Sequence, residues 1–406
     1  MDHFELRNGE LYAEDVPLAR IAAEVGTPVY VYSRATLERH ARVFREGLSA
    51  LKSVHLAFAV KSNPNLAVLR VLQREGYGAD VVSGGELERA LRSGMPAEDV
   101  VFSGVGKTAR ELARGLDAGV GQFNIESEEE GRELAAIAEA RGQVAHCALR
   151  VNPDVDAGTH EKISTGKKDN KFGVAIDEAP GIYARLSALP GLDMRGVAVH
   201  IGSQLSDLAP LEKAFIRLGV LIADLRAAGL AVTHADLGGG LGVPYKAGEV
   251  MPSPAAYGAM VAKVTEGWDV TLMFEPGRVI AGNAGVLLTT VIRVKRNGNR
   301  DPFVIVDAAM NDLARPALYG SWHDFDAVRP RDQRMTTNIV GPICETGDTF
   351  AMGRDIEALE AGGAEYRKFA GFVPEVLVDG DRYAIVADRI APEAITDAER
   401  VPDWLA

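Results

Sequence analysis

The stretch His55-Leu-Ala-Phe-Ala-Val-Lys61-Ser-Asn-Pro64 is an apolar run that delivers one lysine to a turn. Seven more apolar runs typical of buried strands follow it, and the spacing between them leaves room for helices. These runs begin near Ala79, Val100, Gln122, Val144, Arg195, His234 and Thr271. Eight strands that alternate with helices predict a (β/α)8 TIM-like barrel.

Four of the intervening segments have the periodicity of an amphipathic helix. They span residues 66–72, 85–91, 109–118 and 127–140. In the last of these, Ser127 and Glu130 have the spacing of a capping box, which predicts that this helix begins at Ser127.

The pattern changes after about Gly285, where apolar residues recur with a period of two. Residues 286–294, 303–307 and 376–386 therefore predict antiparallel strands, with a hairpin turn at Asp379-Gly380. The run at residues 28–32 is expected to join the same sheet. We therefore expect a β domain made from residues 1–33 and 283–406, with the barrel at residues 34–282 inserted between these parts.

Composition and charge narrow the class of protein. The chain has 406 residues, 47% of them hydrophobic, and a formal net charge of -13. Nucleic acids and anionic membranes attract basic patches, so neither is expected as a partner. The N-terminus lacks the pattern of a signal peptide and no run of 18 apolar residues occurs, which predicts a cytoplasmic protein. The two cysteines cannot form a disulfide framework or a paired-cysteine zinc site, no metal is expected, and Cys147 is predicted to be core.

Polar residues follow several of the predicted strands. In a (β/α)8 barrel, catalytic groups lie at the carboxyl ends of the strands. Six such residues are predicted to gather at one mouth of the barrel: Lys61, Ser83, Asn152, His200, Gly238 and Glu275.

Three of these positions point together to one cofactor. Lys61 can carry a carbonyl cofactor as a Schiff base, and the turn Gly238-Gly-Gly-Leu-Gly242 allows close approach of a phosphate. The turn Glu275-Pro-Gly-Arg278 offers a carboxylate partner for a pyridine nitrogen. Together they predict a pyridoxal phosphate site. Taken alone, a lysine of this kind is usually a solvated charge, and many glycine turns bind nothing. The spacing of these glycines differs from that of dinucleotide-binding loops, which argues against a nicotinamide cofactor.

The chain resembles a known family over about residues 10–350 and again from about 374. The segments that carry the resemblance are 58–63, 80–87, 200–204, 238–245, 275–278 and 344–348, which look like those of fold-type III pyridoxal-phosphate decarboxylases. The segment Met310-Asn-Asp-Leu-Ala-Arg-Pro-Ala-Leu-Tyr319 points within that group to the diaminopimelate decarboxylases. The resemblance implies an architecture similar to that of alanine racemases, a barrel with a second β domain.

The resemblance also implies roles for individual residues. Lys61 would bear the cofactor and transfer protons, and His200, otherwise readable as a core histidine, would stack on the cofactor ring. The remaining cofactor contacts would come from Ser203, Gly238, Gly239, Gly240, Glu275, Pro276, Gly277 and Arg278.

Substrate contacts would come from Arg278, Arg315, Tyr319 and Glu345. Without the resemblance, the first three would be interpreted as residues in surface ion pairs. Cys344 would donate a proton to the decarboxylated carbon. The alternative interpretation of Cys344 is a buried, unreactive thiol. In the family Cys344 and Glu345 are contributed across a dimer interface, so the resemblance implies a homodimer with composite active sites.

One segment departs from the family pattern. Relatives carry a Gly-Ala-Tyr-Gly motif between the Cys-Glu motif and the terminal Pro-Glu-Val, and its tyrosine lies near the cofactor and substrate. Residues 360–374 of this chain lack that motif and the segment is shorter. Tyr366 is not expected to replace the missing tyrosine, because neither neighbouring glycine matches.

The main hypothesis is a decarboxylase that converts meso-2,6-diaminopimelate into L-lysine and carbon dioxide, the last step of lysine biosynthesis. A second reading keeps the fold and cofactor but changes the substrate to ornithine, arginine or a carboxylated polyamine. A third is a catalytically silent protein that binds pyridoxal phosphate, which the missing tyrosine motif would favour. A racemase of similar design fits the cysteine motif less well.

Overall fold

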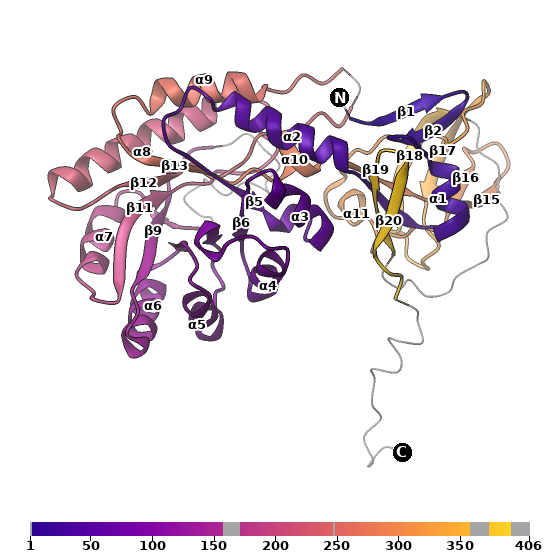
Figure 1. The fold of residues 1–406 in the computed structure, drawn as a ribbon. Helices are drawn as coiled ribbons and strands as arrows, with labels where there is room; N and C mark the ends of the chain where they lie inside the picture. The colour runs from indigo at the N-terminus through magenta and orange to yellow at the C-terminus, as the bar shows by residue number, and fades with distance from the viewer. Residues whose placement is uncertain (1, 157–170, 247, 358–372, 391–406) are drawn as a thin grey trace, which may run out of the picture. The chain divides into compact units, whose positions relative to one another are not determined.

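The computed structural model describes residues 2–156, 171–246, 248–357 and 373–390. The chain divides into two compact units (Figure 1). The barrel unit comprises Leu37–Val243 and Val250–Asn283, and the β unit comprises Met1–Thr36, Pro244–Glu249 and Ala284–Ala406.

A closed ring of eight parallel strands forms the barrel unit. In the order of the ring the strands are β5 (Val54–Ala59), β6 (Gly78–Val81), β7 (Val100–Phe102), β8 (Gln122–Ile125), β9 (Ala145–Asn152), β11 (Leu192–Ala198), β12 (His234–Asp236) and β13 (Thr271–Phe274). The pairing of β13 with β5 closes the ring, and a short strand β10 (Val174–Ala175) pairs with β9 outside it. The predicted barrel is confirmed, and each strand begins within a few residues of its predicted start.

Helices surround the barrel on its outer side (Figure 1). They are α2 (Arg34–Gly47), α3 (Leu66–Arg74), α4 (Gly84–Arg92), α5 (Ala109–Ala118), α6 (Glu128–Arg141), α7 (Ala179–Ser187), α8 (Ala209–Ala227) and α9 (Pro254–Val264), with the short α10 (Arg278–Ala281) after β13. The four helices predicted from periodicity match α3 to α6.

Only half of the capping box predicted at α6 forms. The Ser127 hydroxyl accepts a hydrogen bond from the Glu130 N–H at 3.2 Å, as expected. The Glu130 carboxylate does not bond the Ser127 N–H: its Oε1 lies 2.8 Å from the buried Lys107 ammonium, and its Oε2 accepts from the Glu126 N–H at 3.4 Å. A buried cation needs a charged partner, and this requirement outweighs the second cap bond.

The barrel strands are almost continuously hydrophobic because both of their faces are buried. Phe58, Phe102, Phe123 and Phe274 are fully buried, and the rings of Phe102 and Phe123 stack with centroids 6.0 Å apart. Cys147 is also fully buried on β9, where burial raises the pKa of its thiol. The prediction that Cys147 is core is confirmed.

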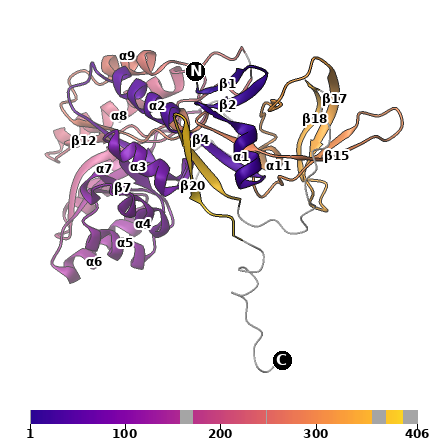
Figure 2. The ribbon, with the colours of Figure 1, turned by 45° about the vertical axis from the view of Figure 1, so that its right-hand side comes forward.

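The β unit is mostly antiparallel, with three sheets (Figure 2). The first contains β1 (Phe4–Arg7), β2 (Glu10–Ala13) and β3 (Val16–Pro17). The second runs β14 (Gly285–Leu288), β4 (Val29–Ser33), β19 (Glu375–Asp379) and β20 (Arg382–Ala387), and the third runs β15 (Val291–Lys295), β16 (Phe303–Val306), β17 (Arg334–Val340) and β18 (Thr349–Glu357). Helices α1 (Leu18–Val25) and α11 (Arg315–Tyr319) complete the unit. The N-terminal run at residues 28–32 does join the sheet, as β4, and Gly380 and Asp381 connect the predicted hairpin.

The prediction of one continuous strand over residues 286–294 was wrong. The run breaks at Thr289-Thr290, and β14 and β15 belong to different sheets. Asp307 causes the break: its carboxylate accepts hydrogen bonds from the Thr289 hydroxyl at 2.6 Å and the Thr290 N–H at 2.9 Å. These bonds replace ladder pairing at the point where the chain passes from one sheet to the other.

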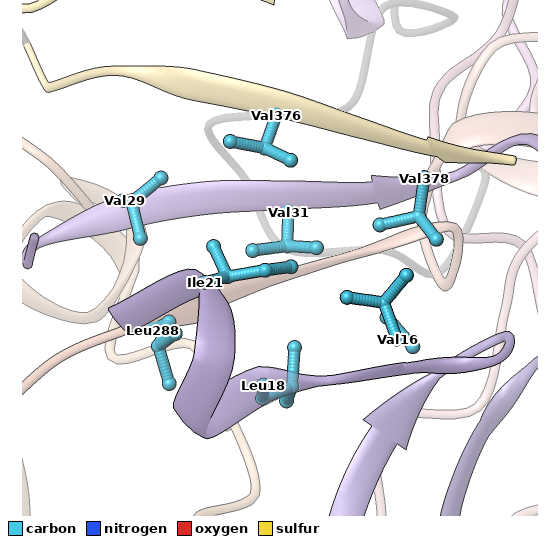
Figure 3. Packing of buried hydrophobic residues seen from close by; sticks show 9 residues of the cluster. Val16, Leu18, Ile21, Val29, Val31, Leu288, Val376 and Val378 are labelled. Carbon is cyan, nitrogen blue, oxygen red and sulfur yellow. The ribbon is translucent and has the colours of Figure 1, made fainter. Parts of the chain in front are cut away.

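Small apolar residues from distant parts of the chain form the core of the β unit. Figure 3 shows Val31 on β4, Val376 and Val378 on β19, and Ile21 on α1 packed against one another. These four side chains are fully buried. Both ends of the chain thus contribute to one hydrophobic core.

Among the described residues, none of the helices has the length and apolar character that crossing a membrane requires.

Candidate active site

Lys61 lies at the carboxyl end of β5, in a single 3₁₀ turn (Val60–Ser62). Its Nζ donates to Asp80 Oδ2 at 2.8 Å, and Asp80, on the neighbouring strand β6, is fully buried. About half of the Lys61 side chain is exposed. Burial lowers the pKa of Lys61, but the charge and hydrogen bond of Asp80 outweigh it and leave the pKa raised. The amine is therefore an accessible ammonium held by a buried carboxylate.

Asparagines fix the chain after Lys61. Asn63 accepts from the Asn65 N–H at 3.0 Å, and Asn65 caps helix α3 by accepting from the Ala67 N–H at 2.9 Å. These local bonds end the 3₁₀ turn and start the helix, as short polar side chains commonly do. Lys61 is held at the barrel mouth by this turn.

The glycine turn after β12 is set by close backbone contacts. Gly238 and Gly240 have φ angles of +64° and +121°, and a Cβ on Gly238 would lie 2.6 Å from the Val199 carbonyl oxygen. The Gly238 N–H donates to Asp236 and the Gly239 N–H donates to His200 Nδ1. Because the N–H groups of Gly238 and Gly239 are already hydrogen-bonded within the chain, these two glycines would help a ligand bind by allowing it to approach the backbone closely.

Ser203 belongs to a loop that packs on the glycine turn. Leu205 and Leu241 form a parallel bridge, with the Leu205 N–H donating to the Gly240 carbonyl at 2.9 Å. The Gln204 amide also exchanges hydrogen bonds with the backbone of Val243. The loop after β11 and the turn after β12 thus form one connected surface.

His200 follows β11 and is held as a neutral imidazole. Its Nδ1 accepts from the Gly239 N–H at 3.2 Å, which places the ring proton on Nε2. Burial, together with the positive charges of Arg150 and Lys61, lowers its pKa well below the usual value. A neutral, half-buried ring is suited to stacking on a flat ligand.

Glu275 follows β13 directly and is buried among polar groups. Its Oε1 lies 3.4 Å from both the Ser103 hydroxyl and the Asn124 amide nitrogen. Burial, with the negative charges of Asp236 and Asp80, raises the pKa of Glu275 well above its usual value. This environment favours the protonated form of the Glu275 carboxyl group.

The rest of this turn packs against the Lys61 segment. The Pro276 carbonyl accepts from the Ala59 N–H at 3.1 Å, and a Cβ on Gly277 would collide with the Ser62 hydroxyl. Arg278 begins helix α10. The turns that carry Lys61 and Glu275 therefore pack directly on each other in the barrel unit.

The two other predicted residues of the mouth have local roles. Ser83 caps helix α4 by accepting from the Glu86 N–H at 3.3 Å, and Asn152 accepts from the Asp154 N–H at 3.0 Å. Both lie at the carboxyl ends of barrel strands, as predicted.

Four predicted site residues belong to the β unit. Arg315 and Tyr319 are on α11, with the guanidinium carbon 5.2 Å from the centre of the tyrosine ring. Cys344 is exposed in the loop after β17, and the Glu345 carboxylate accepts from the Gly347 N–H at 3.3 Å. Tyr366 lies outside the described residues.

Sequence reasoning missed the acidic and amide residues behind the predicted site. Asp80, Asn124 and Asp236 are each at least 98% buried at the ends of β6, β8 and β12. A polar residue near the end of an otherwise apolar strand was the available signal, but their partners come from other strands. Only the folded barrel brings them together.

Three comparisons place this geometry among known proteins. Residues 34–282 match the family model of the pyridoxal-dependent decarboxylase, pyridoxal binding domain. The diaminopimelate decarboxylase of Zymomonas mobilis is 48% identical over 99% of both chains, and that of Pseudomonas fluorescens is 50% identical over 97% of this chain and 99% of the relative. The crystal structure of diaminopimelate decarboxylase from M. jannaschii in co-complex with L-lysine has a TM-score of 0.94 at 30% identity, covering 100% of this chain and 99% of that one.

The described residues fit pyridoxal phosphate. An accessible amine, a neutral imidazole and a buried carboxyl group all come from turns at one mouth of the barrel. The glycines at 238 and 277 are positions where a side chain would collide with the surrounding chain. Lys61, His200 and Glu275 are the groups that would hold the cofactor, with the glycine turn beside its phosphate.

Proposed function

Because the chain belongs to the diaminopimelate decarboxylase family of pyridoxal-dependent decarboxylases, we propose that it converts meso-2,6-diaminopimelate into L-lysine and carbon dioxide. This would be the last step of lysine biosynthesis. The observation that carries the proposal is Lys61 and Glu275 on turns that pack together, in a chain about half identical to diaminopimelate decarboxylases along almost its full length.

Bound pyridoxal phosphate supplies an electron sink for the pair of electrons left when carbon dioxide departs. The chain's own groups prepare this chemistry. Lys61 would hold the cofactor through its amine and would move protons at Nζ, which Asp80 keeps at the barrel mouth. Glu275 would face the ring nitrogen with its carboxyl group, and His200 would offer a neutral ring face.

Recognition of the second amino-acid group of the substrate is proposed for charged residues. Arg278, Arg315 and Tyr319 would bind its carboxylate, since a guanidinium group matches a carboxylate in a bidentate manner. Glu345 would bind the distal amine, and Cys344 would return a proton to the carbon that lost carbon dioxide. The exposed position of Cys344 supports this role because a proton donor must be reachable.

A cytoplasmic homodimer is the assembly we propose, with Cys344 and Glu345 of one subunit serving the barrel of the other. The family resemblance supports it. A dimer of this kind has two identical composite sites, as a two-fold axis requires.

A substrate panel tests the proposed function. Purified protein with pyridoxal phosphate is given meso-diaminopimelate, ornithine, arginine or a carboxylated polyamine, and carbon dioxide release is measured. We expect release from meso-diaminopimelate at a rate at least about tenfold above the others, because they lack the distal carboxylate for Arg315. Faster release from any of the other three would overturn the assigned substrate.

A protein that binds the cofactor without turnover is the second candidate. One observation favours it: the alignment with the Zymomonas relative runs over 420 positions against the 406 residues of this chain, so the relative has residues that this chain lacks. Residues 360–374, which lack the family's tyrosine motif, are a place for such a loss. Cofactor absorbance without carbon dioxide release from any substrate in the panel would support this second candidate.

A further inference from the structure

Asp236 is a buried carboxylate to which the predicted chemistry gives no role. It is the last residue of β12, two residues before the glycine turn, and is 1% exposed. A carboxyl group buried to this extent is costly unless it is hydrogen-bonded or protonated. Its contacts therefore indicate what it does.

Two hydrogen bonds fix the orientation of Asp236. Its Oδ1 accepts from the Gly238 N–H at 2.9 Å, and its Oδ2 accepts from the Asn124 amide at 2.9 Å. The Asn124 side chain is held in turn by Gln122, whose amide donates to Asn124 Oδ1 at 2.8 Å. This bond fixes which end of the Asn124 amide faces the two carboxyl groups.

The same amide group links Asp236 to Glu275. Asn124 Nδ2 lies 2.9 Å from Asp236 Oδ2 and 3.4 Å from Glu275 Oε1, so one amide nitrogen joins the two buried carboxyl groups. Asp236 accepts two bonds of 2.9 Å, whereas the contacts of Glu275 are 3.4 Å long, so Glu275 is the member of the pair with less stabilisation for a negative charge. Two adjacent buried carboxylates do not both ionise readily, because like charges repel strongly where water is excluded.

Other charged groups face this pair from neighbouring strands. Asp80 on β6 adds a second negative charge, and it pairs with Lys61 after β5. Arg150 on β9 acts on Lys61 and on the neutral His200. Among these groups Asp236 is the one that shares the Asn124 amide with Glu275. After burial itself, the charge of Asp236 is the largest cause that raises the pKa of Glu275.

We propose that Asp236 is a positioning residue that keeps a proton on Glu275 in the cofactor-free protein, and that Glu275 gives this proton to the ring nitrogen when pyridoxal phosphate binds. The O–H bond of Glu275 breaks, the lone pair of the nitrogen forms the new N–H bond, and Glu275 becomes the carboxylate that faces the resulting cation. After the transfer, the positive charge of the ring stabilises the Glu275 carboxylate beside Asp236, as the proton did before binding. The proposal rests on the cofactor half of the proposed function and needs no substrate.

Proton counting tests this directly. Cofactor-free protein in weak buffer near pH 7.5 is mixed with pyridoxal phosphate, and a pH indicator reports the protons taken up or released per cofactor bound. The proteins compared are the unmodified chain, Asp236→Asn and Glu275→Gln. The asparagine keeps the shape of Asp236 and an oxygen for the Gly238 N–H, but it leaves Glu275 ionised before binding.

The expected result follows from the protons held before and after binding. The unmodified chain and Glu275→Gln should give the same count. In the unmodified chain the proton for the ring nitrogen comes from Glu275 and not from the solution, and in Glu275→Gln the ring nitrogen stays unprotonated. Asp236→Asn should take up about one more proton than either. Equal counts for the unmodified chain and Asp236→Asn, each one proton above Glu275→Gln, would overturn the proposal.

Two controls keep the result interpretable. Asp193→Asn makes the same chemical change near the amino end of β11, where Asp193 pairs with His146 and Arg195, and it should match the unmodified chain. If Asp236→Asn does not fold, the comparison of the unmodified chain with Glu275→Gln still decides, because a difference of one proton between them contradicts the proposal. Absence of cofactor binding in the unmodified chain would contradict the proposed function as well, whereas absence of decarboxylation would leave this result standing.

Discussion

The pair formed by Lys61 and Asp80 has two consequences for the barrel mouth. It holds the amine in place, and it keeps the amine protonated, whereas attack on a carbonyl group requires the neutral amine. Asp80 thus positions the Lys61 amine but lowers the fraction of it that is neutral and reactive. Removal of Asp80 should separate these two effects.

Reduction with borohydride should attach the cofactor to Lys61 permanently. Mass spectrometry of the digested protein should find the modified peptide in the unmodified chain and not in Lys61→Ala. Lys263→Ala changes a lysine whose side chain is 77% exposed and should leave the labelling unchanged. Labelling of a peptide without residue 61 would contradict the assignment.

Asp80→Asn should shift the pH dependence of cofactor attachment. The pKa of Lys61 is raised by Asp80 in the folded chain, so the ion pair is present below the ordinary lysine pKa and is lost as the pH rises through the raised value. Without Asp80 the neutral amine should form at lower pH. Stopped-flow absorbance from pH 8 to above the raised pKa of Lys61 should therefore show the midpoint of the attachment rate moving down, and an unchanged or higher midpoint would contradict this reading.

Secondary structure was predictable where one segment carries its own signal. The eight barrel strands and α3 to α6 follow from apolar periodicity between turns, which is a local property. The break between β14 and β15 could not be predicted this way, because Thr289 and Thr290 continue a good strand pattern. Its cause, Asp307, lies in the next strand-like run and acts only after folding. The pairing of Asp236 with Asn124 was missed for the same reason.

Helix α1 is expected to contribute strongly to the stability of the β unit. Ile21 is fully buried between the helix and the sheet that contains β4 and β19. Ile21→Ala should cost about 3 kcal/mol in the free energy of unfolding, from lost burial and the cavity left behind. Chemical denaturation followed by circular dichroism measures this.

The control for this prediction is Ile385→Ala on β20. Its side chain is 48% exposed, so its loss should change the free energy of unfolding by less than about 0.5 kcal/mol. Equal effects of the two substitutions would show that α1 does not pack as described.

The residues proposed for function lie in both units of the molecule. Lys61, His200 and Glu275 belong to the barrel unit, and Arg315 and Cys344 belong to the β unit, which both ends of the chain build. The barrel unit supplies the groups suited to the cofactor, so cofactor binding and substrate recognition are proposed to depend on different parts of the fold. This division makes the two functions separable by mutation.

Mixed dimers test the proposed sharing of active sites. Lys61→Ala and Cys344→Ala should each be inactive alone in a homodimer with composite sites. When the two are unfolded together and refolded, random pairing should restore about a quarter of the activity, because half of the dimers are mixed and each mixed dimer has one intact site. No recovery, or an active monomer in sedimentation, would contradict the composite site.

The central claim is that this chain decarboxylates meso-diaminopimelate although residues 360–374 lack the family's tyrosine motif. The most direct measurement follows L-lysine and carbon dioxide together, from purified protein supplied with pyridoxal phosphate, while the cofactor absorbance of the same sample is recorded. The account predicts equal amounts of the two products in the unmodified chain and none in Lys61→Ala. A bound cofactor with neither product would contradict it and would show a chain that keeps the cofactor site without the reaction.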